Sequence, residues 1–559
     1  MAKNTSNIRI LYPALLIVGI ILVNFLLNGI HLRWDLTGNK RYTLSEASKG
    51  SVLSIQEPIT IDVFLKGDLP AEFRKLQQET EQILSEFAAV NPRLKYHFID
   101  PMDNDEEREA NLRMLQQLGL TPASVTIEEG SRVSQELVFP WALANVGEQT
   151  VRIPLLKNIL GASNEERINS SVQELEYAFA DAFTKLGLTD KKKIAVLKGN
   201  GELEDLQIAD FLSSLKEYYQ IAPFTLDSVA NTPERTLNQL KTFDLVIVAK
   251  PSEAFSDSEK LVLDQYTLNG GKSLWMVDQV AISMDSIFKN EGKSIAMPMD
   301  LNLNDMFFKY GVRINPALIN DLYFTQIVLA TGSGNNSQYN PVPWLYAPMV
   351  RSSNDHAINN NIEAVRMQFV NPIDTLQNGI KKTVLLRSSP LSKPVGTPVE
   401  VDLEMVTQQP DQNTYTKGNM PVAVLLEGNF TSVFNNRILP FKTSNYKNEG
   451  IETKMIVISD GDIIRNDLQN GRPLELGYDK WTNNFYGNKE FLLNCVNYML
   501  EENGLINIRN KKIALAFLDQ QRIVEDKNYW QLVNIGVPVV LILIFAGVFN
   551  GIRRRNYNR

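Results

Sequence analysis

Two long apolar segments, one near each end of the chain, constrain its fold more than any other feature of the sequence. Residues 10–32 and residues 528–552 contain no Asp, Glu, Lys or Arg. Each segment exceeds the roughly 20 residues that a helix needs to cross a hydrocarbon layer about 30 Å thick. The sequence therefore predicts two transmembrane helices, with everything between them on one side of the membrane.

Positive charges beside the second segment indicate which side that is. Arg553, Arg554 and Arg555 directly follow it, and the cytoplasmic flanks of membrane helices are enriched in Lys and Arg. We therefore expect a two-pass protein of the inner membrane, with residues 1–9 and 553–559 in the cytoplasm and the large central region in the periplasm. A cleaved signal peptide is the alternative for the N-terminus, but the long apolar run and the bulky residues after it disfavour cleavage.

The composition of the chain excludes some partners. A net charge of −8 and a pI near 5.3 oppose binding to nucleic acid. The proportions of hydrophobic residues (44%) and charged residues (21%) are those of a globular protein. The single cysteine, Cys495, rules out an internal disulfide, and its place on the apolar face of a predicted helix favours a buried structural thiol.

Strands and helices alternate in the first extracytoplasmic domain, which we expect over residues 33–160. Predicted strands cover 59–65, 94–99 and 124–127, and predicted helices cover 71–89 and 106–118. This β-α-β-α-β order predicts a compact α/β layer domain with a thioredoxin-like order of elements, although the redox Cys-x-x-Cys is absent. A long helix near 165–186 is expected to form a link over 161–190.

Continuous apolar strands indicate a second α/β domain over residues 191–505. Its predicted strands cover 194–197, 243–248 and 272–277, and its predicted helices include one from Ile208 and one over 257–268. Strand and helix alternating in this way predict a doubly wound sheet with right-handed crossovers. Segments 384–386, 422–426 and 455–458 are expected to complete or extend that sheet. Residues 506–527 form a juxtamembrane segment before the second span.

Polar residues directly after two predicted strands are the best candidates for a ligand or partner cleft. Asn200 and Glu202 lie in a glycine turn, and Asp460 and Asp462 follow the strand that ends near 458. Ligands of α/β sheets bind at the carboxyl ends of the strands. A glycine-enforced turn and an Asp-Gly turn explain the same residues structurally, and that interpretation is favoured.

Motifs of common enzymes are missing. Lys272-Ser273 follows two glycines, but Tyr266 stands where a P-loop needs its first glycine. The chain has three histidines, no His-Glu-x-x-His and no Gly-x-Ser-x-Gly. We therefore predict no catalytic residue, no metal site and no cofactor.

A motif after the first apolar segment carries a family resemblance. Its residues are Asp35, Leu36, Thr37, Arg41, Tyr42, Thr43, Leu44 and Ser45, and Ser45 is also a good N-cap for a short helix. Further matching segments are 199–202, 243–247, 270–272 and 486–491. Over essentially the whole chain, the sequence resembles the auxiliary, formerly "substrate-binding", subunit of gliding-motility-associated ABC transporters in Bacteroidota.

The resemblance implies a noncatalytic subunit that works with a polytopic ABC permease and a cytoplasmic ABC ATPase, in the service of gliding motility and associated protein secretion. It also implies a second domain similar to a degenerate glutamine-amidotransferase-like fold. Members of the wider family often have histidine where this chain has Asn200. ABC architecture suggests two copies per complex. The alternatives are an extracytoplasmic ligand-binding or enzymatic receptor, and an envelope scaffold that is independent of a transporter.

Overall fold

A computed structural model describes most of the chain between residues 43 and 557. The described residues are 43–103, 108–129, 132–159, 161–188, 190–331, 338–352, 354–443, 445–501, 504, 505, 508 and 526–557. They divide into two units, which span residues 1–512 and 513–559. The first predicted membrane span, over 10–32, lies outside the described residues, as do Asp35, Leu36, Thr37, Arg41 and Tyr42.

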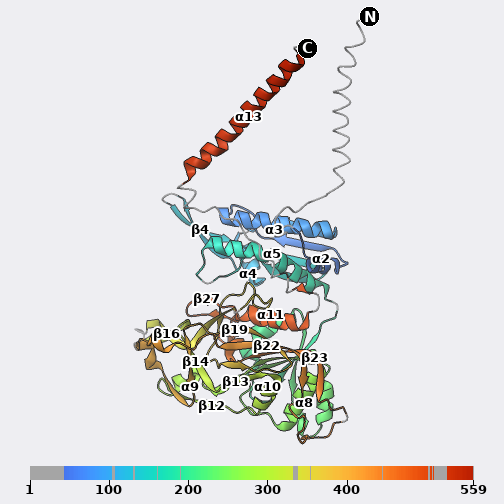
Figure 1. Cartoon of the computed structure of the whole chain (residues 1–559), viewed down its shortest axis with the longest axis vertical. Helices are drawn as coiled ribbons and strands as arrows, with labels where there is room; N and C mark the ends of the chain where they lie inside the picture. The colour runs from blue at the N-terminus through green and yellow to red at the C-terminus, as the bar shows by residue number, and fades with distance from the viewer. Residues whose placement is uncertain are drawn as a thin grey trace. The chain divides into compact units, whose positions relative to one another are not determined.

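The first sheet of the larger unit has four strands in the order β2-β1-β5-β6. The residues that form it lie in the blue to cyan part of the ribbon in Figure 1. These strands are β1 (Ile59–Val63), β2 (Leu94–Phe98), β5 (Trp141–Val146) and β6 (Gln149–Pro154). Strand β1 runs parallel to β2 and antiparallel to β5, which pairs antiparallel with β6. The sheet is therefore mixed, with a β-α-β unit on one side and a hairpin on the other.

One predicted strand of this sheet lies elsewhere. Strand β3 (Ala123–Glu129) pairs with β4 (Arg132–Val138) in a separate two-stranded ribbon, and within the described residues neither pairs with the four-stranded sheet. The expected β-α-β-α-β order is present along the chain, but its third strand does not join the four-stranded sheet. Strand β5, not β3, pairs with β1. Ala142 and Ala144 of β5 are fully buried in the core, whereas the sequence of β3 is rich in Ser, Thr and Glu.

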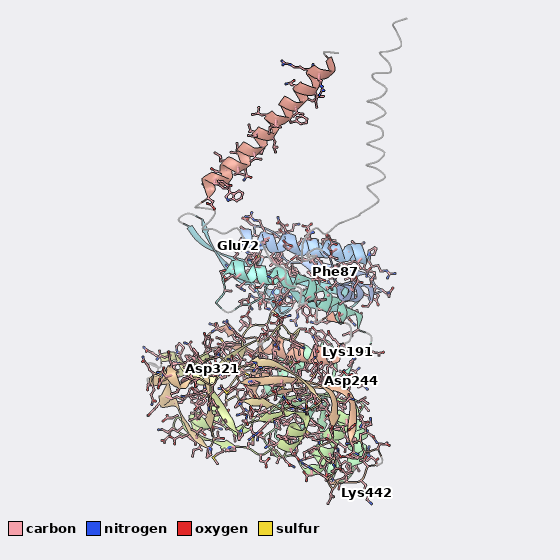
Figure 2. All side chains as sticks on the ribbon, viewed as in Figure 1. Glu72, Phe87, Lys191, Asp244, Asp321 and Lys442 are labelled. Atoms are coloured by element: carbon pink, nitrogen blue, oxygen red, sulfur yellow. The ribbon has the colours of Figure 1, made fainter. Side chains whose placement is uncertain are left out.

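Helices complete the hydrophobic core of this sheet. They are α2 (Glu46–Leu53), α3 (Ala71–Val90) and α5 (Asn164–Gly187). Helix α4 (Arg108–Gln117) packs through Leu115 into a separate small cluster with Phe64 and Leu143. Phe87 on α3 (Figure 2) packs edge-on against Phe183 on α5, with ring centroids 4.9 Å apart, and also contacts Phe179. Helix α5, expected as a link between domains, therefore forms part of the first core. Leu505 and Ile508 also belong to this core, so the chain returns to the first sheet after the second.

The second sheet has ten strands in the order β15-β16-β19-β22-β23-β10-β9-β7-β8, with β17 paired to β16. Its parallel part consists of β7 (Lys193–Lys198), β8 (Gln220–Thr225), β9 (Leu245–Ala249), β10 (Lys272–Met276) and β23 (Glu449–Ile458). Its antiparallel part consists of β15 (Phe324–Thr331), β16 (Gln338–Ser352), β17 (Val365–Arg366), β19 (Lys381–Arg387) and β22 (Pro421–Thr431). The predicted strands are confirmed, and the later ones extend the same sheet.

Helices cover both faces of this sheet, which explains why a central parallel strand such as β9 is apolar throughout. One face packs against α6 (Ala209–Lys216) and α11 (Asn488–Leu500). The other packs against α7 (Pro233–Leu240), α8 (Asp257–Leu268) and α10 (Asn304–Tyr310). Cys495 on α11 is fully buried, as expected, and burial raises the pKa of its thiol well above the usual value.

A smaller layer packs beside the second sheet around Trp344, which is fully buried. Its elements are β11 (Val280–Ala281), α9 (Met284–Lys289), β12 (Lys293–Pro298), β14 (Ala317–Asp321), β20 (Ser392–Gly396) and β21 (Val399–Asp402). Strands β13 (Val312–Ile314) and β18 (Ile373–Thr375) pair with each other and pack into the core that contains α10. Short hairpins form from β24 (Leu468–Gln469) with β25 (Arg472–Pro473), and from β26 (Tyr478–Asp479) with β27 (Asn484–Phe485).

The second unit contains one long helix, α13 (Lys527–Tyr557). Its segment Tyr529–Arg555 is long and apolar enough to cross a membrane, with a mean hydropathy of 2.6, and no other helix among the described residues meets that test. Apolar side chains such as Leu532 and Phe545 are exposed around it. A helix that is apolar on all sides needs an apolar surrounding such as lipid. The predicted second span is thus present as a helix.

Candidate functional site

The carboxyl ends of four parallel strands of the second sheet meet at one edge. Strands β7, β9, β10 and β23 end near residues 198, 249, 276 and 458. The residues that follow them include the predicted turn 199–202 and the predicted Asp460 and Asp462, together with Lys250 and Asp278. The sheet topology, rather than any local motif, brings these side chains to the same edge.

A lysine lies between two carboxylates at this edge. The Lys250 Nζ is 3.3 Å from Asp278 Oδ2 and also forms an ion pair with Asp462 Oδ2. The Lys250 side chain is 18% exposed, and those of Asp278 and Asp462 are 8% and 10% exposed. At Gly461, an added Cβ would lie 2.5 Å from the Lys250 Cγ. Glycine is therefore required there to let the lysine pack against the loop.

Burial and charge act in opposite directions in this cluster. Burial disfavours the charged Lys250, but the nearby carboxylates of Asp278 and Asp462 outweigh it and raise the lysine pKa above its usual range. Burial raises the pKa of Asp278, and burial together with the Asp278 and Asp462 charges raises that of Asp460 well above normal. A lysine that stays protonated in this way cannot act as a nucleophile or general base near neutral pH.

Asp460 has a structural role. Its Oδ1 accepts a hydrogen bond from the Asp462 backbone N at 2.8 Å, and its Oδ2 accepts one from the Gln368 N at 2.7 Å. The Gly461 N donates to Asp278 Oδ1 at 2.6 Å. The expected Asp-Gly turn is therefore fixed to two neighbouring loops.

The turn over 199–202 is held by the loop after β9. The Asn200 carbonyl accepts hydrogen bonds from Ser252 N and Glu253 N, both at 3.0 Å. Glu202 Oε2 accepts one from Asn200 N at 2.8 Å, and burial raises the Glu202 pKa. Gly199 and Gly201 have φ values of 117° and 71°, so the turn needs glycine at both positions.

The predicted cleft thus divides into two parts. Asn200 lies with Glu202, and Asp460 lies with Asp462, but within the described chain no hydrogen bond or ion pair joins the first pair to the second. The sequence analysis missed Lys250 and Asp278. The signal that could have found them is their position, one or two residues beyond the end of a buried parallel strand.

A polar cavity of about 350 Å³ lies beside the Asp460 and Asp462 part. Asn200 and Glu202 do not line it. Its charged lining consists of Asp285, Asp460, Asp462, Asp467, Arg366, Arg465 and Lys480. Both signs of charge are present on its wall.

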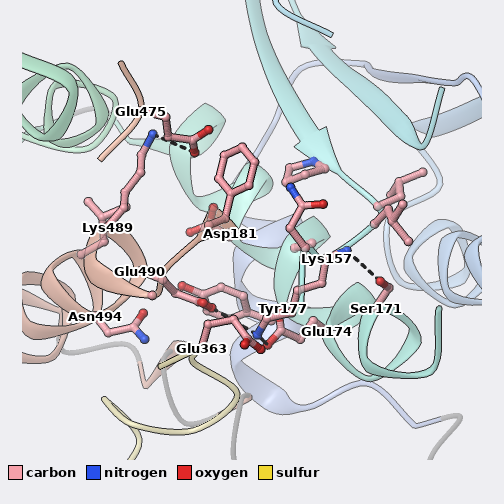
Figure 3. A pocket seen from close by; sticks show the side chains of 18 of the residues that line it. Lys157, Ser171, Glu174, Tyr177, Asp181, Glu363, Glu475, Lys489, Glu490 and Asn494 are labelled. Atoms are coloured by element: carbon pink, nitrogen blue, oxygen red, sulfur yellow. Dashed lines mark hydrogen bonds and ion pairs between the residues drawn. The ribbon is translucent and has the colours of Figure 1, made fainter. Parts of the chain in front are cut away.

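A second pocket, of about 380 Å³, lies between α5 of the first core and helix α11 with its preceding loops (Figure 3). Lys157 forms two ion pairs at this pocket: its Nζ lies 2.9 Å from Glu174 Oε1 and 3.6 Å from Glu490 Oε1 on α11. Asp181 on α5 accepts a hydrogen bond from the Tyr218 hydroxyl at 2.7 Å. The contact across this pocket therefore consists largely of charged and polar side chains.

The chain passes between the two sheets twice, near residues 188–192 and near residues 500–504. The Lys192 Nζ donates a hydrogen bond to the Leu500 carbonyl at 2.6 Å, which ties the two passages together. Burial and the nearby Asp181 charge raise the pKa of Glu501, beside the second passage, to about 8. The second sheet is therefore an insertion in the chain that builds the first core.

The remaining predicted residues occupy structural positions. Leu44 is buried in the first core, and Ser45 caps α2 by accepting from Ser48 N, while its own N donates to Glu176 Oε1 on α5 at 2.7 Å. The cap was expected from the sequence. Thr43 is also described, and Arg553, Arg554 and Arg555 lie in the last turns of α13. Among the described residues, no group of three or more His, Cys, Asp or Glu side chains is arranged to hold a metal ion.

Comparison with known proteins gives two family matches. A family model described as "ABC-type uncharacterized transport system" matches residues 191–495, and a model of a domain of unknown function matches residues 38–145. No curated protein matches the chain. A solved structure titled "mmIFT52 N-terminal domain" aligns with 13% identity over 55% of this chain and 97% of its own, with a TM-score of 0.32. That similarity is too low to indicate a shared fold.

Proposed function

Because the chain belongs to the ABC-type uncharacterized transport system family of auxiliary proteins, we propose that it is a noncatalytic, membrane-anchored extracytoplasmic subunit of an ABC transporter complex. The family match over residues 191–495 carries this proposal, since it covers more than half of the chain. A polytopic permease and a cytoplasmic ATPase would be separate chains of the complex. The absence of a P-loop from this sequence agrees with that division of labour.

The chemistry of the carboxyl edge supports a noncatalytic role. Lys250 is held protonated by Asp278 and Asp462, and Asp460 uses both carboxylate oxygens to fix backbone groups. The buried Cys495 has a raised pKa, which keeps its thiol protonated and unreactive. Such a site agrees with our proposal that the second sheet is a degenerate relative of glutamine-amidotransferase-like folds.

We place the large unit in the periplasm and both termini in the cytoplasm. The helical, apolar α13 and the three arginines at its end support a second span with a cytoplasmic C-terminus. The apolar run over 10–32 supports the first span from sequence alone. With two anchors, the large unit would stay fixed beside the permease rather than diffuse as a solute receptor does.

The double passage between the two sheets offers a way to transmit movement. Leu44, which follows the first predicted span, and Leu505, which precedes the second, both lie in the first core. Movement of the permease would therefore reach that core through both anchors. The second sheet would then follow through the passages near Lys192 and Leu500. Lys157 pairs with Glu174 on α5 and also with Glu490 on α11, so the contact between the two cores includes ion pairs that a movement could rearrange.

We also propose a role in gliding motility and associated protein secretion, which the motif of residues 35–45 supports. Two copies per complex are a further part of the proposal, and ABC architecture supports them. Native mass measurement of the purified complex tests the copy number, because one copy per assembly contradicts it. Deletion of the gene in a gliding host tests the cellular role. We expect loss of gliding that the intact chain restores.

Labelling of engineered cysteines tests the topology with little background, because Cys495 is fully buried. We expect a membrane-impermeant maleimide to label Lys442→Cys, at an exposed position of the large unit, once the outer membrane is opened. Arg555→Cys should become labelled only after the inner membrane is lysed. Labelling of both sites at the same stage would contradict the proposed arrangement.

A further inference from the structure

The second sheet ends in a strand whose outer edge has no partner among the described residues. Strand β15 stands last in the strand order and pairs with β16, which Figure 1 labels at this end of the sheet. An unpaired strand edge presents a row of backbone N–H and C=O groups, and such a row can pair with another strand. The edge of β15 is therefore a candidate interaction surface.

Two prolines of β16 show which backbone groups of β15 point outward. Pro343 lies opposite Gln326, and Pro341 lies opposite Val328. Proline has no N–H, so neither pair can exchange two hydrogen bonds, and both are the non-hydrogen-bonded pairs of the ladder. The N–H and C=O groups of Gln326, Val328 and Ala330 therefore point away from β16. Within the described chain, none of these backbone groups has a hydrogen-bond partner.

This edge lacks the protection that the neighbouring edges have. Proteins commonly protect exposed strand edges with proline or with charged side chains. The outer edge of β16 in the same hairpin carries Pro341 and Pro343, and β8, at the opposite end of the sheet, carries Pro223. Strand β15, with the sequence FTQIVLAT, has neither a proline nor a charged residue. Its edge is thus open to a further strand.

The sequence of β15 is complementary to itself. In an antiparallel pair centred on Val328, that residue lies opposite Val328 of a second copy, and Gln326 lies opposite the second copy's Ala330. All three outward residues then exchange two hydrogen bonds each with their opposite residues. On the other face, Ile327 lies opposite the second copy's Leu329, so that apolar side chains meet. Any other register pairs fewer of the three outward residues with one another.

We propose that two copies of this chain pair edge to edge through β15, antiparallel and about a twofold axis at Val328. The ten-stranded sheets of the two copies then form one continuous sheet across the axis. The absence of charge from the strand means that no like charges meet there. In the transporter complex this is the contact between the two copies proposed above, and in that respect it rests on the proposed function. The membrane anchors confine both copies to one bilayer, which raises their local concentration.

Disulfide cross-linking of the intact chain in phosphatidylcholine vesicles tests the register. Val328→Cys places the two Cα atoms about 5.5 Å apart, within reach of a disulfide. Gln326→Cys is the matched control, because its two copies lie about 14 Å apart, four residues out of step along the strands. Gln326→Cys reconstituted together with Ala330→Cys brings two cysteines opposite each other again. Cys495 is fully buried and adds little background.

We expect a cross-linked dimer from Val328→Cys and from the mixture, and about tenfold less from Gln326→Cys alone. Val328→Pro provides a second measurement. It removes an outward N–H but none of the bonds between β15 and β16, so we expect it to weaken pairing about tenfold or more in native mass measurement of the detergent-solubilised chain. Val328→Thr keeps both the N–H and the branched shape and should pair as the unchanged chain does. Should Val328→Pro fail to fold, cross-linking still decides the question.

The proposal is overturned if Val328→Cys gives no cross-linked dimer, if Gln326→Cys alone cross-links equally well, or if a folded Val328→Pro pairs as the unchanged chain does. The vesicles contain neither a permease nor an ATPase. Absence of the cross-link therefore leaves the assignment to a transporter complex untouched. Conversely, recovery of the chain without transporter components leaves the cross-linking result valid.

Discussion

Replacing Lys250 with Met tests the electrostatics of the carboxyl edge. Methionine keeps much of the length and apolar stem of lysine but removes the charge between Asp278 and Asp462. At 3.3 Å and an effective dielectric constant of about 20, one such ion pair has a gross Coulomb energy of about 5 kcal/mol. Desolvation offsets much of this in the intact cluster. Removing the cation leaves the two buried carboxylates without their shared lysine, so we expect a loss of about 3–5 kcal/mol of stability.

The same variant should show a characteristic pH dependence. Burial already raises the pKa of Asp278 above its usual 3.8, and loss of the lysine raises it further. The folded protein then binds more protons than the unfolded chain above pH 3.8, so stability falls as the pH rises through the folded-state pKa. We therefore expect Lys250→Met to lose more stability relative to the unchanged chain at pH 8 than at pH 5.

Urea denaturation in detergent at both pH values measures this difference. Lys381→Met is a matched control, because Lys381 is 70% exposed although it lies 2.8 Å from Glu427, and we expect it to cost less than about 1 kcal/mol. Adding Asp278→Asn and Asp462→Asn to Lys250→Met should restore much of the loss. Equal losses for the two lysine variants, or a loss that is the same at both pH values, would refute the reasoning.

Three further predictions concern the two cores and their connection. Phe179→Ala should cost about 3–5 kcal/mol in urea denaturation, because the ring is fully buried against Phe87 and Phe183; a cost below about 1 kcal/mol contradicts that packing. Ser256→Ala should cost about 1 kcal/mol, since it removes the capping box of α8, and an unchanged denaturation midpoint counts against the cap. The Glu501 pKa of about 8 exceeds its usual 4.5, so the folded state holds extra protons and loses stability as the pH rises towards 8. Thermal unfolding of Glu501→Gln at pH 6 and 9 should lack this part of the pH dependence, and identical profiles for both chains argue against a buried acid.

Strands and helices with strong local signals could be predicted from the sequence. The strand near 245–249 is a continuous apolar run because helices cover both of its faces. Helix α8 has the residues of a capping box at its start, and its predicted bounds agree with the structure. Strand β8 was missed because its edge position leaves it half-exposed and tolerates Pro223.

Features that depend on distant pairing could not be predicted. The pairing of β5 with β1 joins residues about 80 positions apart in the sequence, and β3 forms a separate ribbon with β4. Likewise, Leu505 joins a core built mostly from residues before 188, which no periodicity can reveal. At the carboxyl edge, Asp460 and Asp462 could be predicted as candidates because they lie close together in the sequence, directly after a predicted strand. Lys250 and Asp278 are single charged residues, and they become neighbours only through the strand order β9-β10-β23.

Affinity purification of the intact chain from its own membranes in mild detergent tests the central claim most directly. A version that ends before α13 serves as the control, because it keeps the large unit and lacks the second anchor. We predict that the intact chain recovers a polytopic permease and an ATPase with Walker motifs in stable ratio, and that the control recovers less of both. Recovery of the intact chain without either component would contradict the assignment to a transporter complex.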